Sequence, residues 1–247
     1  MVPAVEIGPF VIPTGGLVYI LGVGLALSVV EWAAKASKQD VQTMYSLAVT
    51  ILGFGLVGAR LLFVGLHWSA YQQNLVGIVW PLTAGFELSG GLVMGILAGI
   101  FYSRAKNLAP AGTLNVLLPG LITGLMVVSL ADFLAGPGYG SETTMPWGLT
   151  QYAIRRHPVQ LYEIGVGLMA LGGWWFMAQL RPTVPGRTLL AALILYSAGR
   201  LFVDAFRGNP WLTAGGYHLV QIISLIALSG ALLSFTRFIP ETYHPNE

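Results

Sequence analysis

Seven apolar stretches occupy most of the sequence, and each is close to the ~20 residues that a helix needs to cross the roughly 30 Å hydrocarbon core of a bilayer. Glycine and proline clusters separate several of them, as at positions 135–138 and 208–210. The chain is therefore expected to be an all-α integral membrane protein with about seven transmembrane helices. The expected spans cover residues 15–34, 44–66, 86–102, 111–134, 159–180, 188–206 and 218–235.

The shortage of charge supports this class. Charged residues make up 9% of the chain, against about a quarter in soluble proteins, so a soluble fold could not cover its surface with them. A net charge of +2 without a basic run gives no reason to expect a nucleic-acid partner. No connection is long enough in sequence to suggest a soluble domain, so residues 1–247 are expected to form a single transmembrane domain.

The distribution of lysine and arginine predicts how the chain crosses the membrane, because cytoplasmic loops carry more of these residues. If the N-terminus lies outside, three basic residues face outward, namely Arg155, Arg156 and Arg207. Seven then face inward, namely Lys35, Lys38, Arg104, Lys106, Arg181, Arg187 and Arg237. This bias predicts an outside N-terminus and a cytoplasmic C-terminus.

With that orientation, the polar residues of several spans gather toward the outer leaflet. Arg60, Glu87, Asp132 and Glu163 come from four different spans, and Arg200, Asp204 and Arg207 follow at i, i+4 and i+7 as one expected stripe of the sixth. Ionisable residues within spans are costly and usually face a bundle interior or a wet cavity. They could be structural ion pairs or a pocket for a phospholipid head group, since arginine forks match phosphate oxygens. Their one-sided distribution speaks against a transport path.

Glycines in the third expected span favour close helix packing rather than a functional site. Gly91, Gly95 and Gly99 repeat at intervals of four residues, which is the small-xxx-small pattern of closely packed membrane helices.

Two motifs carry a resemblance to a known family. Residues 156–163 read R-H-P-V-Q-L-Y-E and resemble the H-P-[ST]-Q-L-Y-E signature of bacterial prolipoprotein diacylglyceryl transferases. Residues 199–207 read G-R-L-F-V-D-A-F-R and are similar to that family's G-R-[FIL]-x-[VI]-E-[FY]-F-R stretch. Weaker counterparts follow in the same order as in the family, at Ile7-Gly8-Pro9, Gly58-Ala59-Arg60 and Ser89-Gly90-Gly91.

The resemblance implies a multi-pass protein of the bacterial cytoplasmic (inner) membrane. Family members transfer a diacylglyceryl group from phosphatidylglycerol to the lipobox cysteine of a preprolipoprotein at the outer face of the membrane, and they release glycerol phosphate. No cofactor or metal takes part, so side chains must supply a base for the thiol and cations for the departing phosphate. A phosphatidylglycerol-like phospholipid and a lipobox peptide are the implied partners.

The chain departs from the family pattern where that chemistry would be carried out. Ser89 replaces a family histidine, and Ser129 replaces the arginine of a second signature. Four further positions also differ from that pattern, namely Gly15, Asp132, Ala135 and Pro137. Asp204 stands where the family has glutamate. Asp132 in place of asparagine adds a negative charge where an anionic phosphate is expected.

The leading hypothesis is a divergent family member, a pseudoenzyme whose transferase activity is lost or altered. It would bind phospholipid in an outer-leaflet polar pocket or serve as a subunit of a membrane assembly. The lipid contacts assigned to it are Arg60, Ser89, Gln160, Tyr162, Arg200, Asp204 and Arg207. One alternative is an active transferase with a rebuilt site, in which His157 or Glu163 is the base and Arg200 assists. The other is a purely structural membrane subunit.

Overall fold

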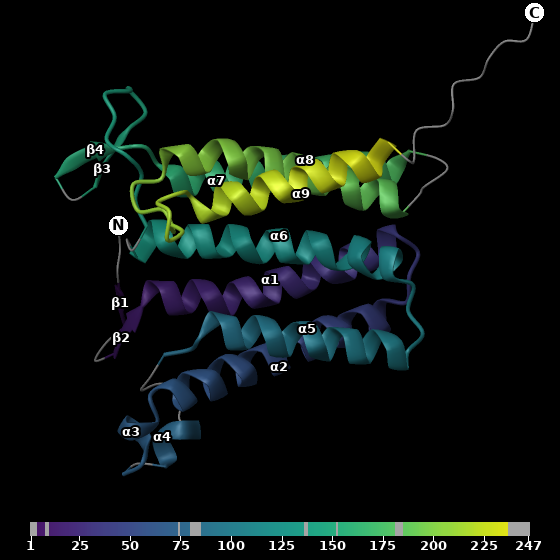
Figure 1. Ribbon diagram of the computed structural model, residues 1–247, viewed down its shortest axis with the longest axis horizontal. Helices are drawn as coiled ribbons and strands as arrows, with labels where there is room; N and C mark the ends of the chain where they lie inside the picture. The colour runs from purple at the N-terminus through teal and green to yellow at the C-terminus, as the bar shows by residue number, and fades with distance from the viewer. Residues whose placement is uncertain are drawn as a thin grey trace, which may run out of the picture. The chain divides into compact units, whose positions relative to one another are not determined.

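The computed structural model describes residues 4–7, 10–73, 75–79, 85–135, 138–151, 153–180 and 185–236. Gly8, Pro9, Pro137, Arg181 and Arg237, which entered the sequence predictions, lie outside the described residues. Figure 1 shows a protein dominated by helices. The elements are β1 Ala4–Ile7, β2 Phe10–Pro13, α1 Thr14–Ala36, α2 Val41–Leu66, α3 Trp68–Tyr71, α4 Val76–Val79, α5 Leu88–Ala105, α6 Pro110–Ala135, β3 Leu149–Gln151, β4 Ile154–Arg156, α7 Val159–Gln179, α8 Pro185–Val203, η1 Asp204–Phe206 and α9 Leu219–Phe235.

The long helices confirm the predicted membrane class. Among the described residues, six helices are long and apolar enough to cross a bilayer, and α9 is a shorter apolar helix of 17 residues. Each expected span coincides with one of these helices to within a few residues. The exact number of crossings and the outside N-terminus stay predictions. The two antiparallel hairpins, β1–β2 and β3–β4, were not predicted from the sequence.

The chain divides into two compact units, and the division passes through two helices. Unit 1 consists of residues 1–29 and 118–247, and unit 2 consists of residues 30–117. The boundaries therefore fall inside α1 and inside α6, in the second case next to Pro119, which interrupts the helical hydrogen-bond pattern. The expectation of a single domain stays a prediction.

Unit 2 is built on the close packing of α2 against α5, which run alongside each other in Figure 1. A Cβ atom at Gly58 would lie 2.6 Å from the carbonyl oxygen of Gly90, and one at Gly90 would lie 2.5 Å from the carbonyl oxygen of Gly58. A Cβ at Gly95 would meet the carbonyl oxygen of Ile51 at 3.1 Å. The backbones approach so closely because these positions carry no side chain, which confirms the packing role predicted for the glycines of this span.

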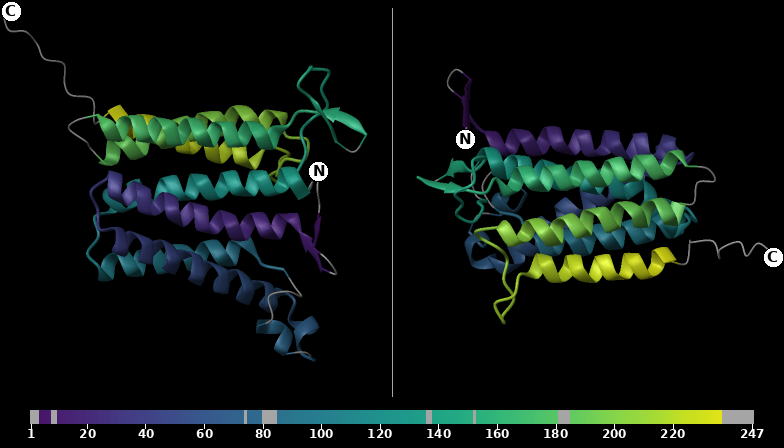
Figure 2. Two further views of the ribbon diagram at one scale, coloured as in Figure 1. Left: turned by 180° about the vertical axis from the view of Figure 1, so that it is seen from behind. Right: turned by 90° about the horizontal axis from the view of Figure 1, so that it is seen from above.

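Unit 1 contains α7, α8 and α9, which lie next to one another in both views of Figure 2. One face of α7 is buried, and it repeats at the three-to-four-residue spacing of a helix. Gly199 allows α8 to approach that face, since a Cβ there would lie 2.5 Å from Val166. The buried residues are Val159, Gln160, Glu163, Val166, Gly167, Ala170 and Trp174.

Backbone hydrogen bonds join three distant segments at the N-terminal end of α7. Ser141 N donates to Phe206 O at 2.7 Å, and His157 N donates to Ser141 O at 3.0 Å. Gly208 N donates to Tyr139 O at 2.9 Å. The segment from residue 138 to 142 therefore runs between the end of α8 and the start of α7, and it brings the two predicted motifs of unit 1 together.

The expected stripe of Arg200, Asp204 and Arg207 on one helix is wrong in its geometry. Helix α8 ends at Val203, a single 3-10 turn follows from Asp204 to Phe206, and Arg207 already has an extended backbone. Tightening into a 3-10 turn is a common way for a helix to end, and the Gly-Asn-Pro sequence that follows cannot continue it. The side chain of Arg207 nevertheless folds back toward the end of α8, and its Nε atom lies 3.8 Å from Oδ1 of Asp204.

Candidate polar site in unit 1

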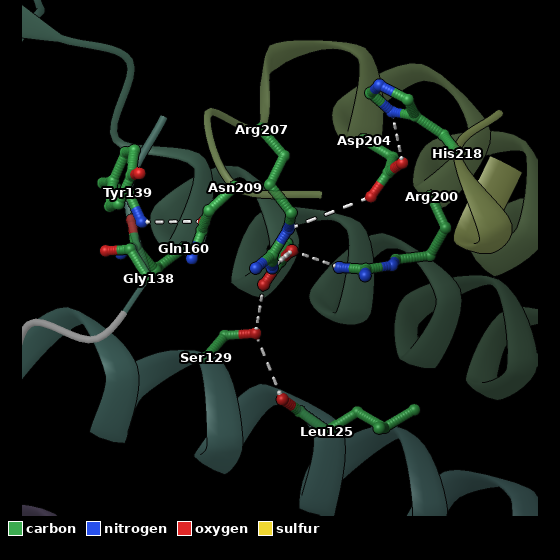
Figure 3. Close-up of polar contacts among 11 residues, drawn as sticks. Leu125, Ser129, Gly138, Tyr139, Gln160, Arg200, Asp204, Arg207, Asn209 and His218 are labelled. Carbon is green, nitrogen blue, oxygen red and sulfur yellow. Dashed lines mark hydrogen bonds and ion pairs between the residues drawn. The ribbon is translucent and has the colours of Figure 1, made fainter. Parts of the chain in front are cut away.

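Glu163 is the centre of the polar cluster in unit 1, and its partners Ser129, Arg200 and Arg207 are labelled in Figure 3. Its Oε1 atom accepts from Arg200 Nη1 at 2.5 Å and also from Arg207 Nη2. Its Oε2 atom accepts from Ser129 Oγ at 2.6 Å. Only 5% of the Glu163 side chain is exposed. Both carboxylate oxygens are therefore engaged by groups from α6, from α8 and from the turn after α8.

A second acidic group lies beside this cluster. Asp204 is 1% exposed, and its Oδ1 atom lies 3.8 Å from Nε of Arg207. Its Oδ2 atom accepts from His218 Nδ1 at 3.0 Å. A carboxylate can only accept, so Nδ1 of His218 carries a proton, and in the neutral form of the ring Nε2 keeps its lone pair. The cluster thus holds two arginines and two carboxylates, whose formal charges cancel.

Gln160 lies one turn before Glu163 on the same face of α7, and it is 1% exposed. Its Nε2 atom donates to the carbonyl oxygen of Gly138 at 2.5 Å, and Gln151 Nε2 donates to the same oxygen at 2.9 Å. A Cβ at Gly138 would lie 3.3 Å from the amide nitrogen of Gln160 and 3.6 Å from the Asp132 carboxylate. Glycine at this position therefore lets the loop sit directly on the two amides.

A cavity of about 200 Å³ opens beside Gln160. The residues around it come from the end of α6, from β3 and from the segment that enters α7. They are Phe133, Leu149, Thr150, Gln151, Arg156, His157, Pro158 and Gln160.

The predicted base His157 has a side-chain partner at the start of α7. Its Nδ1 atom lies 3.2 Å from the hydroxyl of Tyr162, and that hydroxyl accepts from Trp147 Nε1 at 2.8 Å. A hydroxyl oxygen can accept more than one hydrogen bond, so Tyr162 joins the indole of Trp147 to the imidazole of His157 at the start of α7.

Arg60 and Ser89 belong to unit 2, so they are described apart from the cluster. Arg60 is 8% exposed and donates to three backbone carbonyls, at 3.0 Å to Ile78, 3.0 Å to Gly85 and 2.5 Å to Gly77. Its guanidinium also lies over the rings of Tyr71 and Phe86. Ser89 is exposed, and its hydroxyl donates to Glu87 Oε1 at 3.1 Å.

The structure thus brings together Gln160, Glu163, Arg200, Asp204 and Arg207 from the predicted site, and it places His157 and Tyr162 at the neighbouring end of α7. Their roles in binding or catalysis stay predictions. In the described part of the chain, no group of three or more His, Asp or Glu side chains could hold a metal ion.

Sequence reasoning missed three members of this site. Ser129 was considered only as a lost arginine, yet it is a partner of Glu163. His218 stood at the start of an apolar stretch, and nothing in its neighbours indicated a pairing with Asp204. Arg156 was counted toward the orientation and stood at the start of the quoted R-H-P-V-Q-L-Y-E stretch, but it was given no place in the site, where it lines the cavity beside Gln160.

Comparison with known proteins identifies the family. A family model described as prolipoprotein diacylglyceryl transferase matches residues 3–237. A phosphatidylglycerol–prolipoprotein diacylglyceryl transferase of Clostridioides difficile is 27% identical over 215 residues, which cover 85% of this chain and 84% of the relative. Relatives of the same name from Thermosynechococcus vestitus and Synechococcus elongatus are 26% and 27% identical, over 91% and 98% of this chain and 87% and 90% of their own. Together with its apolar helices, these matches show that the chain is a bacterial inner-membrane protein that belongs to the prolipoprotein diacylglyceryl transferase family.

Proposed function

We propose that this family member binds phospholipid at the N-terminal end of α7 and does not carry out diacylglyceryl transfer at an ordinary enzymatic rate. The observation that carries the proposal is the complete engagement of Glu163, with Arg200 and Arg207 on one oxygen and Ser129 on the other. The proposal keeps the substrate class named in the relatives, phosphatidylglycerol, and separates binding from chemistry.

The charge balance supports binding without transfer. Transfer would turn the phosphodiester of phosphatidylglycerol into a phosphate monoester, so the phosphate would gain one negative charge as the C–O bond breaks. Stabilising that charge needs cations that are not already neutralised. Arg200 and Arg207 are balanced by Glu163 and Asp204, the latter 3.8 Å from Arg207. Each guanidinium has five N–H donors, so hydrogen bonds to a lipid phosphate stay available.

The lack of a suitable base for the thiol also supports binding without transfer. Ser89, at the position of the family histidine, donates its proton to Glu87 and cannot accept one from a thiol at neutral pH without a further partner. Glu163 has both oxygens occupied by donors. Neither Ser89, at the position of the family histidine, nor Glu163 is therefore well placed to activate a lipobox cysteine.

The test is a transfer assay on the purified protein with phosphatidylglycerol and a lipobox peptide, beside an active member of the family. We expect a rate at least about a thousandfold below that member, because losing a preorganised charge contact alone costs two to three orders of magnitude, together with co-purified phospholipid in the extract. Transfer at a comparable rate would overturn the proposal. Changing Arg200 should reduce the retained lipid; if it lowers only stability, a structural subunit is the better description.

One observation favours the alternative of an active, rebuilt transferase. His218 has its Nδ1 atom fixed by the buried Asp204, and 28% of its side chain is exposed. A histidine oriented by a carboxylate through one nitrogen is a suitable general base through the other. If transfer is detected, His218→Asn should abolish it and His157→Asn should not. The opposite order would assign the base to His157.

A further inference from the structure

A lysine occupies an unusual backbone position where α1 ends in unit 2. Gln39 N donates to Ala34 O at 2.9 Å, and Lys38 N donates to Lys35 O at 3.1 Å. These two bonds form a Schellman motif, in which the residue after the last helical turn adopts a left-handed backbone. Lys38 is that residue, with a φ of 55°. The end of α1 therefore carries a lysine where glycine is the usual residue.

The end of α5 repeats the motif with a different residue. Leu108 N donates to Ser103 O at 2.9 Å, Asn107 N donates to Arg104 O at 3.1 Å, and Asn107 has a φ of 51°. Asparagine tolerates this backbone because its short side chain can form local hydrogen bonds, whereas lysine has no such compensation. Residues other than glycine that are held in this region cluster at functional sites, so Lys38 calls for an explanation.

Helices α2 and α5 run antiparallel, which brings the two helix ends together. A Cβ at Gly90 would lie 2.5 Å from the carbonyl oxygen of Gly58, and a Cβ at Gly99 would lie 3.1 Å from the side chain of Ile51. Because positions further along α5 meet positions earlier in α2, the end of α5 lies beside the start of α2. Both connections are found at the right-hand end of Figure 1.

The connection after α1 also rests on the helix that follows α5. Asn115 Nδ2, in the second turn of α6, donates to Ser37 Oγ at 3.1 Å. A Cβ at Gly112 would lie 2.7 Å from Nε2 of Gln39. The segments 35–40 and 104–108 therefore form one surface at this end of unit 2, which we call the basic end.

The basic end carries four cations, two from each connection. All four are exposed, and none has an ion-pair or hydrogen-bond partner for its side chain among the residues that the structure describes. They are Lys35, Lys38, Arg104 and Lys106. Two carboxylates lie nearby, namely Glu31, one helical turn before Lys35, and Asp40, which already accepts from Thr43 N. Four cations and two carboxylates leave a net charge of +2.

We propose that the basic end binds the head group of an anionic phospholipid, at a site separate from the one proposed at α7 and independent of it. The predicted orientation places this end on the cytoplasmic side, where anionic lipids give the leaflet a negative surface potential. The ammonium group of Lys38 has three donors on a flexible stem, so it can reach a phosphate at the membrane surface.

A simpler interpretation is that the cations only balance the helix dipoles and set the orientation of the chain. It accounts for Lys35 and Arg104, which lie in the last turns of their helices. It gives no reason for Lys38 to adopt a left-handed backbone, because a lysine one residue earlier or later would serve both purposes without strain. The charge at position 38 therefore distinguishes the two interpretations.

The experiment makes use of a chain that has no cysteine. Ala105→Cys places a single thiol on the exposed last residue of α5, between Arg104 and Lys106, and a fluorophore is attached to it. The full-length protein is reconstituted in phosphatidylcholine nanodiscs that contain a small fraction of nitroxide-labelled lipid. The labelled lipid is either phosphatidic acid or phosphatidylcholine with the same acyl chains. Nitroxide quenches at short range, so the signal reports lipid at the basic end.

We expect phosphatidic acid to be enriched around the fluorophore about 25-fold over phosphatidylcholine, at about fivefold for each of two net charges. Added salt should lower this enrichment, because exposed charges are screened. Inorganic phosphate should not displace the lipid, since it lacks acyl chains that keep a head group at the membrane surface. Displacement by phosphate would make a free anion the ligand and would overturn the proposal.

The decisive variant is Lys38→Gly, in the same labelled background. It removes one charge, so the enrichment should fall to about fivefold, while the melting temperature in phosphatidylcholine alone should rise because glycine adopts the left-handed backbone without strain. Asn107→Gly is the matched control, since it makes the same backbone change in the second motif without removing a charge. Its enrichment should stay at about 25-fold. Lys38→Arg, which keeps the charge, should also keep the enrichment.

The outcomes separate this proposal from the proposed function. Equal quenching by the two lipids, or full enrichment in Lys38→Gly, would show that the basic end binds no anionic lipid. An equal loss in Asn107→Gly would assign the effect to the backbone and would overturn the proposal as well. Either result leaves the binding proposed at α7 standing, because the fluorophore reports only the basic end. A failed transfer and lipid-extraction assay would likewise leave this site standing.

Discussion

Units 1 and 2 bury arginine in different ways. In unit 1, Arg200 and Arg207 share the carboxylate of Glu163, which is 5% exposed. In unit 2, the contacts described for Arg60 are three backbone carbonyls and the faces of two rings. The carbonyls that hold Arg60 lie in the segment between α2 and α5, 17 to 25 residues further along the chain.

The comparison teaches that one chain can satisfy a buried arginine in two ways, with a carboxylate or with backbone carbonyls. A carboxylate partner balances the charge and links helices, but it depends on one residue, whose loss strands the cation. Carbonyl partners require the planar fork of arginine rather than its charge alone. The same contrast extends to packing, since α2 and α5 meet through glycine backbones while α6, α7 and the end of α8 meet through Glu163.

The largest expected effect is that of Glu163→Leu. The change leaves two partly buried guanidinium groups without their shared anion, so the free energy of unfolding should fall by about 3–5 kcal/mol. Denaturant titration in detergent micelles measures it. Glu142→Gln is the control, because Glu142 is 68% exposed and its ion pair with Arg156 spans 3.9 Å; it should cost less than about 1 kcal/mol. Similar costs for the two variants would mean that the Glu163 cluster stabilises little.

A smaller effect is expected where α2 and α5 touch. In Gly58→Ala the new methyl group would lie 2.4 Å from Met94 and 2.6 Å from the Gly90 carbonyl, and overpacking of this kind costs about 1–3 kcal/mol. Gly53→Ala, on the same helix, meets nothing within 4 Å and should not lower the stability. Thermal unfolding followed by tryptophan fluorescence compares them, and equal melting temperatures would contradict the packing argument.

Lysine substitution tests the two arginine environments directly. The three carbonyl contacts of Arg60 leave from three different nitrogens. The single ammonium nitrogen of lysine cannot occupy all three positions, so Arg60→Lys should lose about 1–3 kcal/mol. Arg200→Lys keeps a charge opposite Glu163, whose contact with Arg200 runs through a single nitrogen, and should cost less. The same denaturant titration ranks them. A larger loss at position 200 would reverse the comparison.

Ser129→Ala should have a modest effect within unit 1. It removes the 2.6 Å hydrogen bond to Glu163 Oε2 from a buried position, and a hydrogen bond of this kind to a charged group contributes about 1.5–3 kcal/mol. The loss should lie toward the lower end of this range, because Arg200 and Arg207 still hold the other carboxylate oxygen, Oε1, in place. Ser28→Ala, which removes an exposed bond to Gly24 O within α1, should change the unfolding midpoint very little.

The smallest effect concerns the start of α2. Asp40 Oδ2 accepts from Thr43 N at 2.7 Å, and hydrogen bonds from the Thr43 side chain and then its backbone lower the pKa of Asp40 below its ordinary 3.8. A carboxyl group with a lowered pKa contributes its stabilisation above 3.8 and loses it as the pH falls through the lower folded value. Hydrogen exchange at the Thr43 amide should therefore speed up, relative to its neighbours, only in acid. Asp40→Asn should remove that pH dependence.

The sequence alone determined the membrane class and the family. A bilayer leaves few solutions for the backbone, so apolar stretches of sufficient length must be helices, and every expected span is one. The H-P-V-Q-L-Y-E motif and the order of the weaker motifs determined the family that the match over residues 3–237 confirms. The glycine spacing at Gly91, Gly95 and Gly99 likewise predicted close packing correctly.

Tertiary structure alone decided how the polar groups pair. Arg200, Asp204 and Arg207 had a helical spacing, but the helix ends at Val203, and Arg207 reaches Glu163 because the turn folds back. The pairing of Asp204 with His218 and the two amides on the Gly138 carbonyl depend on a loop whose path no local pattern specifies. The physical reason is that the length of an apolar stretch, which can be read along the sequence, decides which segments form membrane helices. An ion pair or a cavity depends on distances that exist only after the helices and loops have packed.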